Sequence, residues 1–559
     1  MFRPAVRCMP SLLIVATLGL ASCQDQPASD DGTAVAQAPA ASPADACARI
    51  AGMHIGADAI GLPTTGATIT SAELVAADAE GNENGEFCKV LGAIHPFTYT
   101  APDINFEVNL PTNWNGKTLQ FGGGGFNGNL VTGLGRPTLH PADAPTPLAK
   151  GYVTLGSDSG HQSTIGFDGT FLLNDEAMDN YGHMQVKKTH DIAMQLVQAR
   201  YGRAPARNYF IGGSQGGHEG FDAVQRYPDD YDGVVAGYPA HNVVMLHLAA
   251  LNFAKAFMAE GAWINPDEAA FLVAQVYETC DALDAAADGI IANVAACRLA
   301  TTPFKALDAS NPLRCEGGGD GGDTCLSDAQ IAALNIVDSP YETGFPVFND
   351  DAGTAVFPKW TPFEGSTFRD GNQAILGADG PRSALQATPG NATSRYAIAQ
   401  DLTLDAFNDF DPKAYAARVV EVAGRISANS VVIDRFQARG GKLIYFHGLV
   451  DDFITPYSSL QYHERLLKRY GEDALAQFVR FYTVPGMGHG NGIQYNPRIA
   501  LVDVLDAWVE GGEAPGTLVA PDVRDGVNRS RPICLYPLWP RYDGSGNIDD
   551  AASFSCVSE

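Results

Sequence analysis

The stretch that decides the fold runs from Asn208 to Gly233 and reads NYFIGGSQGGHEGFDAVQRYPDDYDG. An apolar run enters a glycine-rich corner, Ser214 stands in that corner, and a helix-like segment leaves it and ends before Pro228. The motif G-x-S-x-G alone is weak evidence in a chain with 60 glycines, because a purely structural turn can produce it. The strand–turn–helix context is the one that a nucleophile elbow requires, so the pattern favours Ser214 as a nucleophile.

Strand-like and helix-like segments alternate on both sides of this corner. The strand-like runs are NFEVNLPTNW, KTLQFGGGGFNGN and GYVTLGSDSGHQ before it and YDGVVAGYPA after it. Between them, residues 183–201 repeat apolar side chains at i, i+4 spacing, as Ile192 and Leu196 do, which predicts an amphipathic helix. This alternation predicts an α/β fold with a mainly parallel sheet flanked by helices.

The alternation is interrupted between His241 and Asp434, where the chain is rich in Ala, Asp, Gly and Asn. The strand signal returns at GGKLIYFHG and AQFVRFYTVPGMGHG. We interpret the interruption as a large inserted lid at residues 241–434, between core residues 47–240 and 435–559. Because the chain has 559 residues, two or three separate domains are the alternative.

The N-terminus indicates export. Two arginines precede an apolar run that is too short to cross a bilayer as a mature helix, which is typical of a signal peptide. The run ends in LASC, which is similar to a bacterial lipobox and predicts removal of residues 1–22 and lipidation of Cys23. An ordinary signal peptide with a chance cysteine is the alternative.

Residues 23–46 have little apolar bulk to bury and predict a flexible tether. Gln24 is not the aspartate that commonly retains lipoproteins at the inner membrane, so we expect the outer membrane or periplasm of a Gram-negative bacterium. The formal net charge of −28 argues against a nucleic-acid partner, because phosphate binding needs clustered Lys and Arg. We therefore expect a small-molecule partner, and contact with a membrane only through the N-terminal lipid.

Two later segments supply the partners of a serine nucleophile in the order acid, then histidine. Asp451 follows the apolar run in LIYFHGLVDDFITP, and His489 lies in FYTVPGMGHGNG. His489 would take the proton of Ser214, and Asp451 would orient the imidazole. Asp452 is an alternative acid and His447 an alternative base, although His447 precedes the acid.

The glycine run in QFGGGGFNG follows an early predicted strand, where α/β-hydrolases contribute one backbone N–H to the oxyanion hole. We predict the N–H of Gly124 as this donor, with Gly125 as the alternative, and the N–H of Gln215 as the second donor. A merely flexible glycine loop is the competing interpretation.

Five segments together resemble the tannase and feruloyl esterase family of α/β-hydrolases, which includes bacterial mono(2-hydroxyethyl) terephthalate hydrolases. They are WNGKTLQFGGGGFNG, SDSGHQ, the Ser214 corner, HGLVD and PGMGHGNG. The resemblance spans about residues 47–556. It implies the triad Ser214, Asp451 and His489, a lid between elbow and acid, and hydrolysis of esters of feruloyl-, galloyl- or terephthaloyl-like acids.

Eight cysteines remain when Cys8 and Cys23 are set aside, and an even number in an exported chain suggests disulfides. The sequence alone allows 105 pairings, of which sequential pairing is the simplest. The family resemblance implies the pairs Cys47–Cys88, Cys280–Cys297, Cys315–Cys325 and Cys534–Cys556. The family usually has a further bridged pair beside the serine and the histidine, where this chain has Gly213 and Gly490. Loss of that clamp puts the rigidity of the site in doubt more than the triad.

The segment CDALDAAADGII gathers Asp281, Asp284 and Asp288 within eight residues. These carboxylates repel one another without a cation, and hard oxygen ligands beside a glycine turn suit Ca²⁺. The resemblance implies a structural calcium ion in the lid, bound by the three aspartates and by the carbonyls of Ala286 and Ile290. A solvated acidic loop is the alternative from the residues alone.

The leading hypothesis is an exported serine carboxylesterase that forms an acyl-enzyme. The alternatives are a serine hydrolase of other esters or of peptides, and an inactive surface lipoprotein with the same fold. Unranked lid candidates for recognising the acid are Trp360, Phe363, Phe368, Arg369, Arg382 and Arg395.

Overall fold

The structure is a computed structural model that describes residues 42–164, 166–348, 354–368, 375–377, 380–490 and 492–558. The predicted signal peptide, the lipidation of Cys23, most of the predicted tether and the candidate Arg369 lie outside these residues. Among the residues that are described, no helix is both long and apolar enough to span a bilayer.

Helix α1 (Pro43–Ala48) begins inside the segment that composition assigned to the tether. Ser42 caps the helix, because its side-chain oxygen accepts a hydrogen bond from the N–H of Asp45 at 3.1 Å. Pro43 stands in the first turn, where its missing N–H costs nothing. The last four residues of the predicted tether, 43–46, thus belong to a capped helix.

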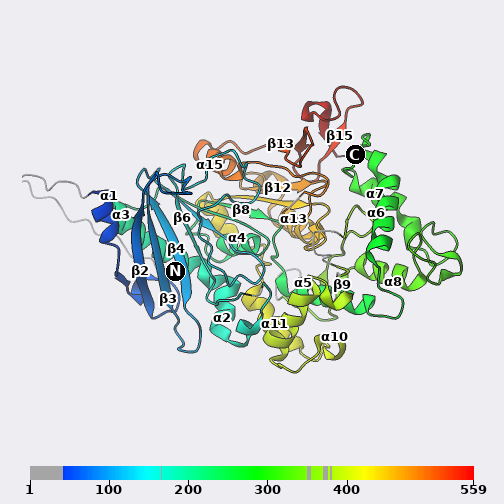
Figure 1. Cartoon of the computed structure of the whole chain (residues 1–559), viewed down its shortest axis with the longest axis horizontal. Helices are drawn as coiled ribbons and strands as arrows, with labels where there is room; N and C mark the ends of the chain where they lie inside the picture. Colours follow the sequence, from blue (N-terminus) through cyan, green and yellow to red (C-terminus); the bar gives the residue numbers. More distant parts are fainter. Residues whose placement is uncertain are drawn as a thin grey trace, which may run out of the picture. The chain divides into compact units, whose positions relative to one another are not determined.

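A ten-stranded sheet runs through the described part of the chain in the order β1-β2-β3-β4-β6-β5-β7-β8-β11-β12 (Figure 1). Neighbouring strands from β1 to β4 pair antiparallel, as do β4 and β6, and all pairs from β6 to β12 are parallel. The strands are β1 His54–Ile55, β2 Gly66–Val75, β3 Phe87–His95, β4 Ile104–Pro111, β5 Lys117–Phe121, β6 Val153–Ser157, β7 Arg207–Gly213, β8 Gly233–Gly237, β11 Lys442–Gly448 and β12 Val479–Val484.

Successive side chains of the parallel strands enter two different apolar clusters, one on each face. Phe210 and Val234 pack with helices α3, α4 and α13, whereas Tyr209, Ile211 and Val235 pack with α15. This alternation is expected of strands covered on both faces. The prediction of a mainly parallel sheet flanked by helices is thus confirmed. The covering helices are α3 Gln185–Tyr201, α4 Gln215–Gln225, α13 Pro456–Tyr470 and α15 Leu501–Gly511.

The antiparallel strands β1, β2 and β3 were not among the predicted strands. They form the blue edge of the sheet in Figure 1, and the disulfide Cys47–Cys88 ties α1 to β3. Their apolar side chains pack on α3 through Ile192, Leu196 and their neighbours. This half of the sheet supplies none of the predicted triad residues.

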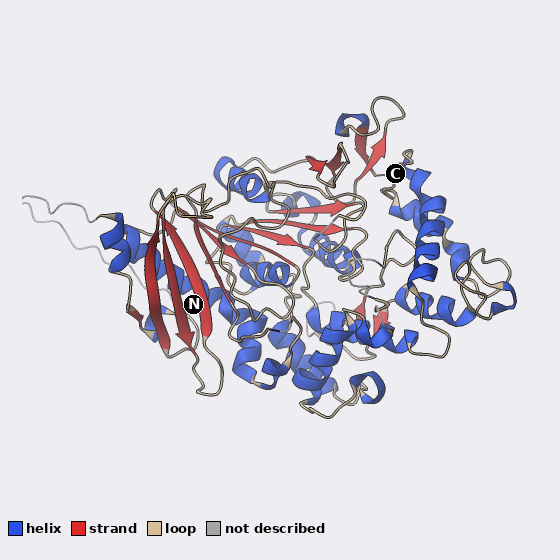
Figure 2. Ribbon diagram, viewed as in Figure 1, coloured by secondary structure: helices blue, strands red, loops and turns tan. Residues whose placement is uncertain are grey.

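Residues 238–441, between β8 and β11, add no strand to the central sheet in their described parts and are mainly helical (Figure 2). They share one apolar cluster in which Trp360, Phe363 and Phe368 are almost fully buried. The elements between β8 and β11 are α5 Val243–Phe257, α6 Pro266–Cys280, α7 Val294–Ala300, α8 Asp328–Val337, β9 Tyr341–Glu342, β10 Val356–Phe357, α9 Ala387–Ala392, α10 Ala406–Asp409, α11 Ala416–Ile426 and α12 Asp434–Arg439.

The remaining elements are short. Helix α2 spans Asp175–Asp179 and α14 spans Glu472–Leu475, and two hairpins end the chain, β13 Leu518–Asp522 with β14 Arg529–Ile533 and β15 Trp539–Tyr542 with β16 Phe554–Val557. All four expected disulfides are present: Cys47–Cys88, Cys280–Cys297, Cys315–Cys325 and Cys534–Cys556. Such bridges persist in oxidising compartments and fit an exported protein.

Candidate active site

Ser214 occupies a sharp corner between β7 and α4, with φ +60° and ψ −119°. The corner requires glycines, because a Cβ on Gly212 would lie 2.5 Å from the backbone of Gly216. A Cβ on Gly217 would lie 2.5 Å from the carbonyl oxygen of Gly237. The strained backbone at Ser214 and the close approach of helix to strand are the features of a nucleophile elbow.

The structure brings the three predicted triad residues into one hydrogen-bonded chain. The Nε2 atom of His489 lies 2.9 Å from the Oγ atom of Ser214, and its Nδ1 atom lies 2.9 Å from the Oδ2 atom of Asp451. Asp451 follows β11 and His489 follows β12, and parallel strands end at the same edge of the sheet. In this geometry the imidazole can accept the serine proton while the carboxylate fixes its tautomer.

Asp451 is fully buried and held by four groups. Its Oδ1 atom accepts hydrogen bonds from the N–H groups of Phe453 and Ile454, each at 2.9 Å. Its Oδ2 atom lies 3.2 Å from the Nε2 atom of His447, in addition to the contact with His489. Burial works to raise the pKa of Asp451, but the charge of His489 and the hydrogen bond from His447 outweigh it, and the pKa is lowered. The carboxylate is therefore ionised at neutral pH.

The alternative residues occupy other places. His447 lies behind Asp451, and its Nδ1 atom is 2.8 Å from the hydroxyl of Ser459, so it supports the acid rather than Ser214. Asp452 is also buried, and its backbone carbonyl accepts a hydrogen bond from Gln386 at 2.9 Å. The acid hydrogen-bonded to the imidazole beside Ser214 is Asp451.

The glycine loop after β5 lies beside the elbow. The N–H of Gly122 donates to the carbonyl of Ile211 at 2.9 Å, and the N–H of Gly123 donates to the carboxylate of Glu219 at 3.0 Å. Both N–H groups already have an acceptor. The expected oxyanion donor Gly124 and its alternative Gly125 are the next residues of this loop. The second expected donor, Gln215, is the first residue of α4, where helix N–H groups lack intrahelical partners.

Glu219 is a site residue that sequence reasoning missed. Its side chain is buried on the inner face of α4, and besides holding Gly123 it accepts a hydrogen bond from the amide of Asn127 at 2.7 Å. The same amide donates to the hydroxyl of Ser159 at 2.6 Å. Burial raises the pKa of Glu219 from 4.5 to about 7. The only sequence signal for Glu219 is its position about one helical turn after Ser214.

Aromatic rings surround the imidazole. The rings of Phe453 and Tyr238 each have their centroid 4.8 Å from that of His489. Phe167 stands 6.2 Å from Phe453 and contributes a further apolar surface. None of these rings was predicted, because they come from three segments without a shared motif.

The lid residues suggested as recognition groups have other contacts in the structure. Trp360 packs edge-to-face on Phe253 at 4.6 Å within the lid cluster. Arg382 pairs with Asp405 at 3.0 Å, and the guanidinium of Arg395 lies on the ring of the adjacent Tyr396. These contacts stabilise the lid itself and give no ground for ranking the residues as substrate contacts.

The predicted calcium ligands lie in one tight loop between α6 and α7. Asp281 accepts a hydrogen bond from the N–H of Gly289 at 2.8 Å, and Asp284 accepts one from the N–H of Ala292 at 2.8 Å. Burial, together with the charges of Asp288 and Asp281, raises the pKa of Asp284 to about 7. The loop therefore crowds like charges on hard oxygen donors, which fits a divalent cation such as Ca²⁺.

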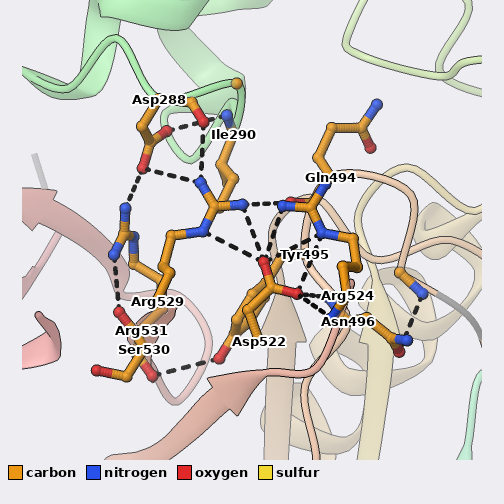
Figure 3. Close-up of polar contacts among 12 residues, drawn as sticks. Asp288, Ile290, Gln494, Tyr495, Asn496, Asp522, Arg524, Arg529, Ser530 and Arg531 are labelled. Carbon is orange, nitrogen blue, oxygen red and sulfur yellow. Dashed lines mark hydrogen bonds and ion pairs between the residues drawn. The ribbon is translucent and has the colours of Figure 1, made fainter. Parts of the chain in front are cut away.

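Asp288 also contacts the hairpin formed by β13 and β14, as Figure 3 shows. Its carboxylate pairs with Arg531, and its backbone carbonyl accepts a hydrogen bond from Arg529 at 2.9 Å. Arg529 also pairs with Asp522 at 3.0 Å. The hairpin thus anchors one end of the acidic loop, while Asp281 and Asp284 accept hydrogen bonds from backbone N–H groups of the loop itself.

Among the described residues, His190, Asp191 and Asp230 bring three possible ligand atoms within 4.8 Å of one another, which the aspartates of the acidic loop do not. The ammonium of Lys187 already pairs with both of those aspartates, at 2.9 and 3.0 Å. That cluster is an ion-pair network with its own cation. In the acidic loop, backbone carbonyls such as those of Ala286 and Ile290 would have to complete a coordination shell.

The chain is similar to known proteins over most of its length. The tannase and feruloyl esterase family matches residues 88–557. The chain is 37% identical over 523 residues to an uncharacterised esterase of Agrobacterium fabrum, covering 92% of this chain and 93% of that protein. It is 30% identical over 535 residues to the mono(2-hydroxyethyl) terephthalate hydrolase of Piscinibacter sakaiensis, covering 85% of each.

The fold is likewise similar to a solved structure. The crystal structure of feruloyl esterase B from Aspergillus oryzae superposes with a TM-score of 0.73 at 22% identity, covering 92% of this chain and all of that one. At this identity the likeness supports the fold, whereas the family match and the two relatives support the class of enzyme. The chain belongs to the tannase and feruloyl esterase family and is a carboxylic ester hydrolase.

Proposed function

We propose that this protein is an exported serine esterase that cleaves esters of aromatic carboxylic acids through Ser214, His489 and Asp451. The observation that carries the proposal is the hydrogen-bonded chain from Asp451 through His489 to Ser214, with both distances at 2.9 Å. Ser214 would attack the ester carbonyl, and His489 would pass the serine proton to the leaving alcohol. Water activated by the same imidazole would then release the acid.

The tetrahedral intermediates need donors for the oxygen that becomes negative. The proposed donors are the N–H groups of Gly124 and Gln215, which border the serine from the loop after β5 and from the start of α4. Glu219 would keep the loop in place through its hydrogen bond with Gly123. Each donor of this kind contributes about 10²- to 10³-fold to kcat in serine hydrolases.

The aromatic acid class is supported by the relatives and by the surroundings of His489. The names of two relatives specify terephthalate and feruloyl esters. Phe453 lies beside the imidazole, and Phe167 stands next to Phe453, so an aromatic acyl group would meet apolar rings there.

Hydrolysis of a substrate panel by the purified mature chain tests the proposal. The panel contains methyl ferulate, a gallate ester, mono(2-hydroxyethyl) terephthalate, a long-chain aliphatic ester and a peptide amide. The aromatic esters should have the highest kcat/KM, and Ser214→Ala should abolish turnover of all of them. Preference for the aliphatic ester or the peptide, or turnover that survives Ser214→Ala, would contradict the proposal.

We also propose that the acidic loop of the lid binds a structural Ca²⁺ through Asp281, Asp284 and Asp288, with the carbonyls of Ala286 and Ile290. The crowded carboxylates support it, since a bound cation would relieve their repulsion. Isothermal titration of the chelator-treated protein with CaCl₂ should show one saturable site, lost in Asp284→Asn. Identical titrations of the two proteins would count against it.

We further propose that the protein is exported and carries a lipid at Cys23, at the outer membrane or in the periplasm of a Gram-negative bacterium. The LASC sequence and the four disulfides are the grounds. Expression with radiolabelled palmitate should label the wild type and leave Cys23→Ser unlabelled. A soluble, unlabelled wild-type protein would favour an ordinary signal peptide.

A further inference from the structure

Tyr238 occupies an unusual position directly after β8. Its backbone has φ +33°, a region that side-chain-bearing residues seldom adopt, and its N–H donates to the carbonyl of Phe446 at 2.7 Å. The phenol ring is largely buried and packs edge-to-face on Phe446, with centroids 5.8 Å apart. The end of β8 therefore directs an aromatic ring toward the edge of the sheet where β7 and β12 also end.

The hydroxyl end of this ring lies between the two glycines that flank the catalytic serine and histidine. A Cβ on Gly213 would lie 2.3 Å from the Tyr238 oxygen, and a Cβ on Gly490 would lie 2.6 Å from the same oxygen. A side chain at either position would overlap the ring as it stands, and Gly490 also has φ +72°, which favours glycine. Two positions so close to one atom are at most about 5 Å apart, near the range of about 3.5–4.5 Å that separates the Cβ atoms of a disulfide.

The ring also touches the imidazole itself. Its centroid is 4.8 Å from that of His489 with an interplanar angle of 66°, an edge-to-face arrangement. The hydroxyl lies 3.0 Å from the hydroxyl of Thr138, which anchors the ring to the segment between β5 and β6. One side chain therefore contacts the residue before Ser214, the residue after His489 and the imidazole between them.

We propose that Tyr238 is the positioning residue of this site: its ring fills the space between Gly213 and Gly490 and holds the histidine loop against the nucleophile elbow. The inference rests on the proposed function, because it assigns a task to a contact with His489. It also explains how the chain manages without a covalent link between these two loops, since packing of a rigid ring takes the place that a bridge would fill. The ring acts through His489 and needs no contact with the substrate.

Steady-state kinetics of two variants test the role of the ring. Tyr238→Ala should lower kcat for an ester that the wild type hydrolyses by about 10- to 100-fold with KM changed less than threefold, because a displaced imidazole slows proton transfer rather than binding. Tyr238→Phe keeps the ring and should retain kcat within about threefold. Tyr231→Ala, at a buried tyrosine on the other face of the sheet, controls for general destabilisation, with active sites counted by a titrating inhibitor.

Equal kcat in Tyr238→Ala and wild type would overturn the proposal. A loss in Tyr238→Phe as large as in Tyr238→Ala would also overturn it, because the hydroxyl and not the ring would then matter. If the wild type hydrolyses no ester, the proposed function fails, and the geometry is then judged by the exchange experiment alone.

An exchange experiment tests the geometry without relying on activity. In the wild-type background, Gly213→Cys with Gly490→Cys should destabilise the protein and form no bond, because Tyr238 fills the space. In the Tyr238→Ala background the same pair should form a disulfide, seen as a mass loss of two hydrogens on the linked peptides, and should recover melting temperature. A bond that forms equally in both backgrounds, or in neither, would show that the ring does not occupy the shared space.

Discussion

The corner around Ser214 and the acidic loop of the lid both concentrate polar groups, but they balance charge differently. At the corner, the carboxylate of Asp451 is held by His489, by His447 and by two backbone N–H groups. In the acidic loop, three carboxylates of the same sign come from eight consecutive residues, and only Asp288 reaches arginines of the C-terminal hairpin. The acid of the corner is balanced by protein groups, whereas the crowding of the loop supports the proposed cation.

The difference shows in the pKa values. Opposite charge and hydrogen bonds lower the pKa of Asp451 in spite of its burial. Burial and like charge raise the pKa of Asp284 to about 7. The lowered pKa of Asp451 supports the proposed proton transfer at the corner, and the raised pKa of Asp284 supports the proposed cation in the loop.

The largest effect is expected at the acid of the corner. Asp451→Asn removes the charge that fixes the tautomer of His489 and should lower kcat by about 10⁴-fold, with little change in the fold. Asp452→Asn is the matched control and should lower kcat by less than tenfold. Steady-state kinetics on one aromatic ester measure both. Similar losses of kcat in the two variants would contradict the assignment of Asp451, rather than Asp452, as the acid of the triad.

The next effect concerns the carboxylate beneath the glycine loop. Glu219→Ala frees the N–H of Gly123 and the amide of Asn127, so the loop that carries the oxyanion donor should lose its place. We expect kcat to fall by about 10- to 100-fold while KM changes little, since a donor for the transition state is lost. Unchanged kcat in a folded variant would show that catalysis does not depend on Glu219.

Glu219 also makes stability depend on pH. Folded Glu219 keeps its proton up to about pH 7, whereas an unfolded chain releases it near its ordinary value of 4.5. The folded state binds more protons in that window, so its stability should fall as pH rises from about 4.5 to above 7, by about 3 kcal/mol from this group. Glu219→Gln should flatten this part of the curve in urea unfolding at a series of pH values. Parallel curves for the two proteins would show that Glu219 titrates normally.

The smallest effect on turnover is expected from removing calcium. Chelation by EDTA should lower the melting temperature by about 2–5 °C, because a ligand at 100 times its Kd stabilises the folded state by about 2.7 kcal/mol. Turnover at 25 °C should change less than threefold, since the loop supplies no group to the corner. Calorimetry with EDTA and after re-addition of CaCl₂ measures the shift. A melting temperature that changes neither with EDTA nor with added CaCl₂ would contradict calcium binding by the acidic loop.

Much of the architecture was predictable from the sequence because parallel strands buried on both faces leave continuous apolar runs. We expected β5, β7, β11 and β12 for this reason. The predicted triad residues lie in the loops that follow β7, β11 and β12. Strand β2 escaped notice because most of its side chains are only partly buried, and β3, although mostly buried, carries no motif. Helix α1 was not predicted inside the tether segment, since its cap depends on Ser42 and Pro43 and not on average composition.

The supporting residues of the corner could not be predicted in the same way. Glu219 and Asn127 come from two segments, and Tyr238 is separated from Gly490 by more than two hundred residues. Their roles depend on packing distances of a few ångströms, which no local pattern records. The sequence showed glycines beside Ser214 and His489 in place of a bridged pair of cysteines. The structure shows that the ring of Tyr238 occupies the space beside both glycines.

The central claim, that Ser214 is a nucleophile activated by His489, is tested most directly by covalent labelling. A fluorophosphonate probe should add one label per chain, mapped by peptide mass spectrometry to Ser214. His489→Ala should slow the labelling by several orders of magnitude, and Ser214→Ala should abolish it. A folded wild-type protein that takes no label, or takes it at another serine, would contradict the account.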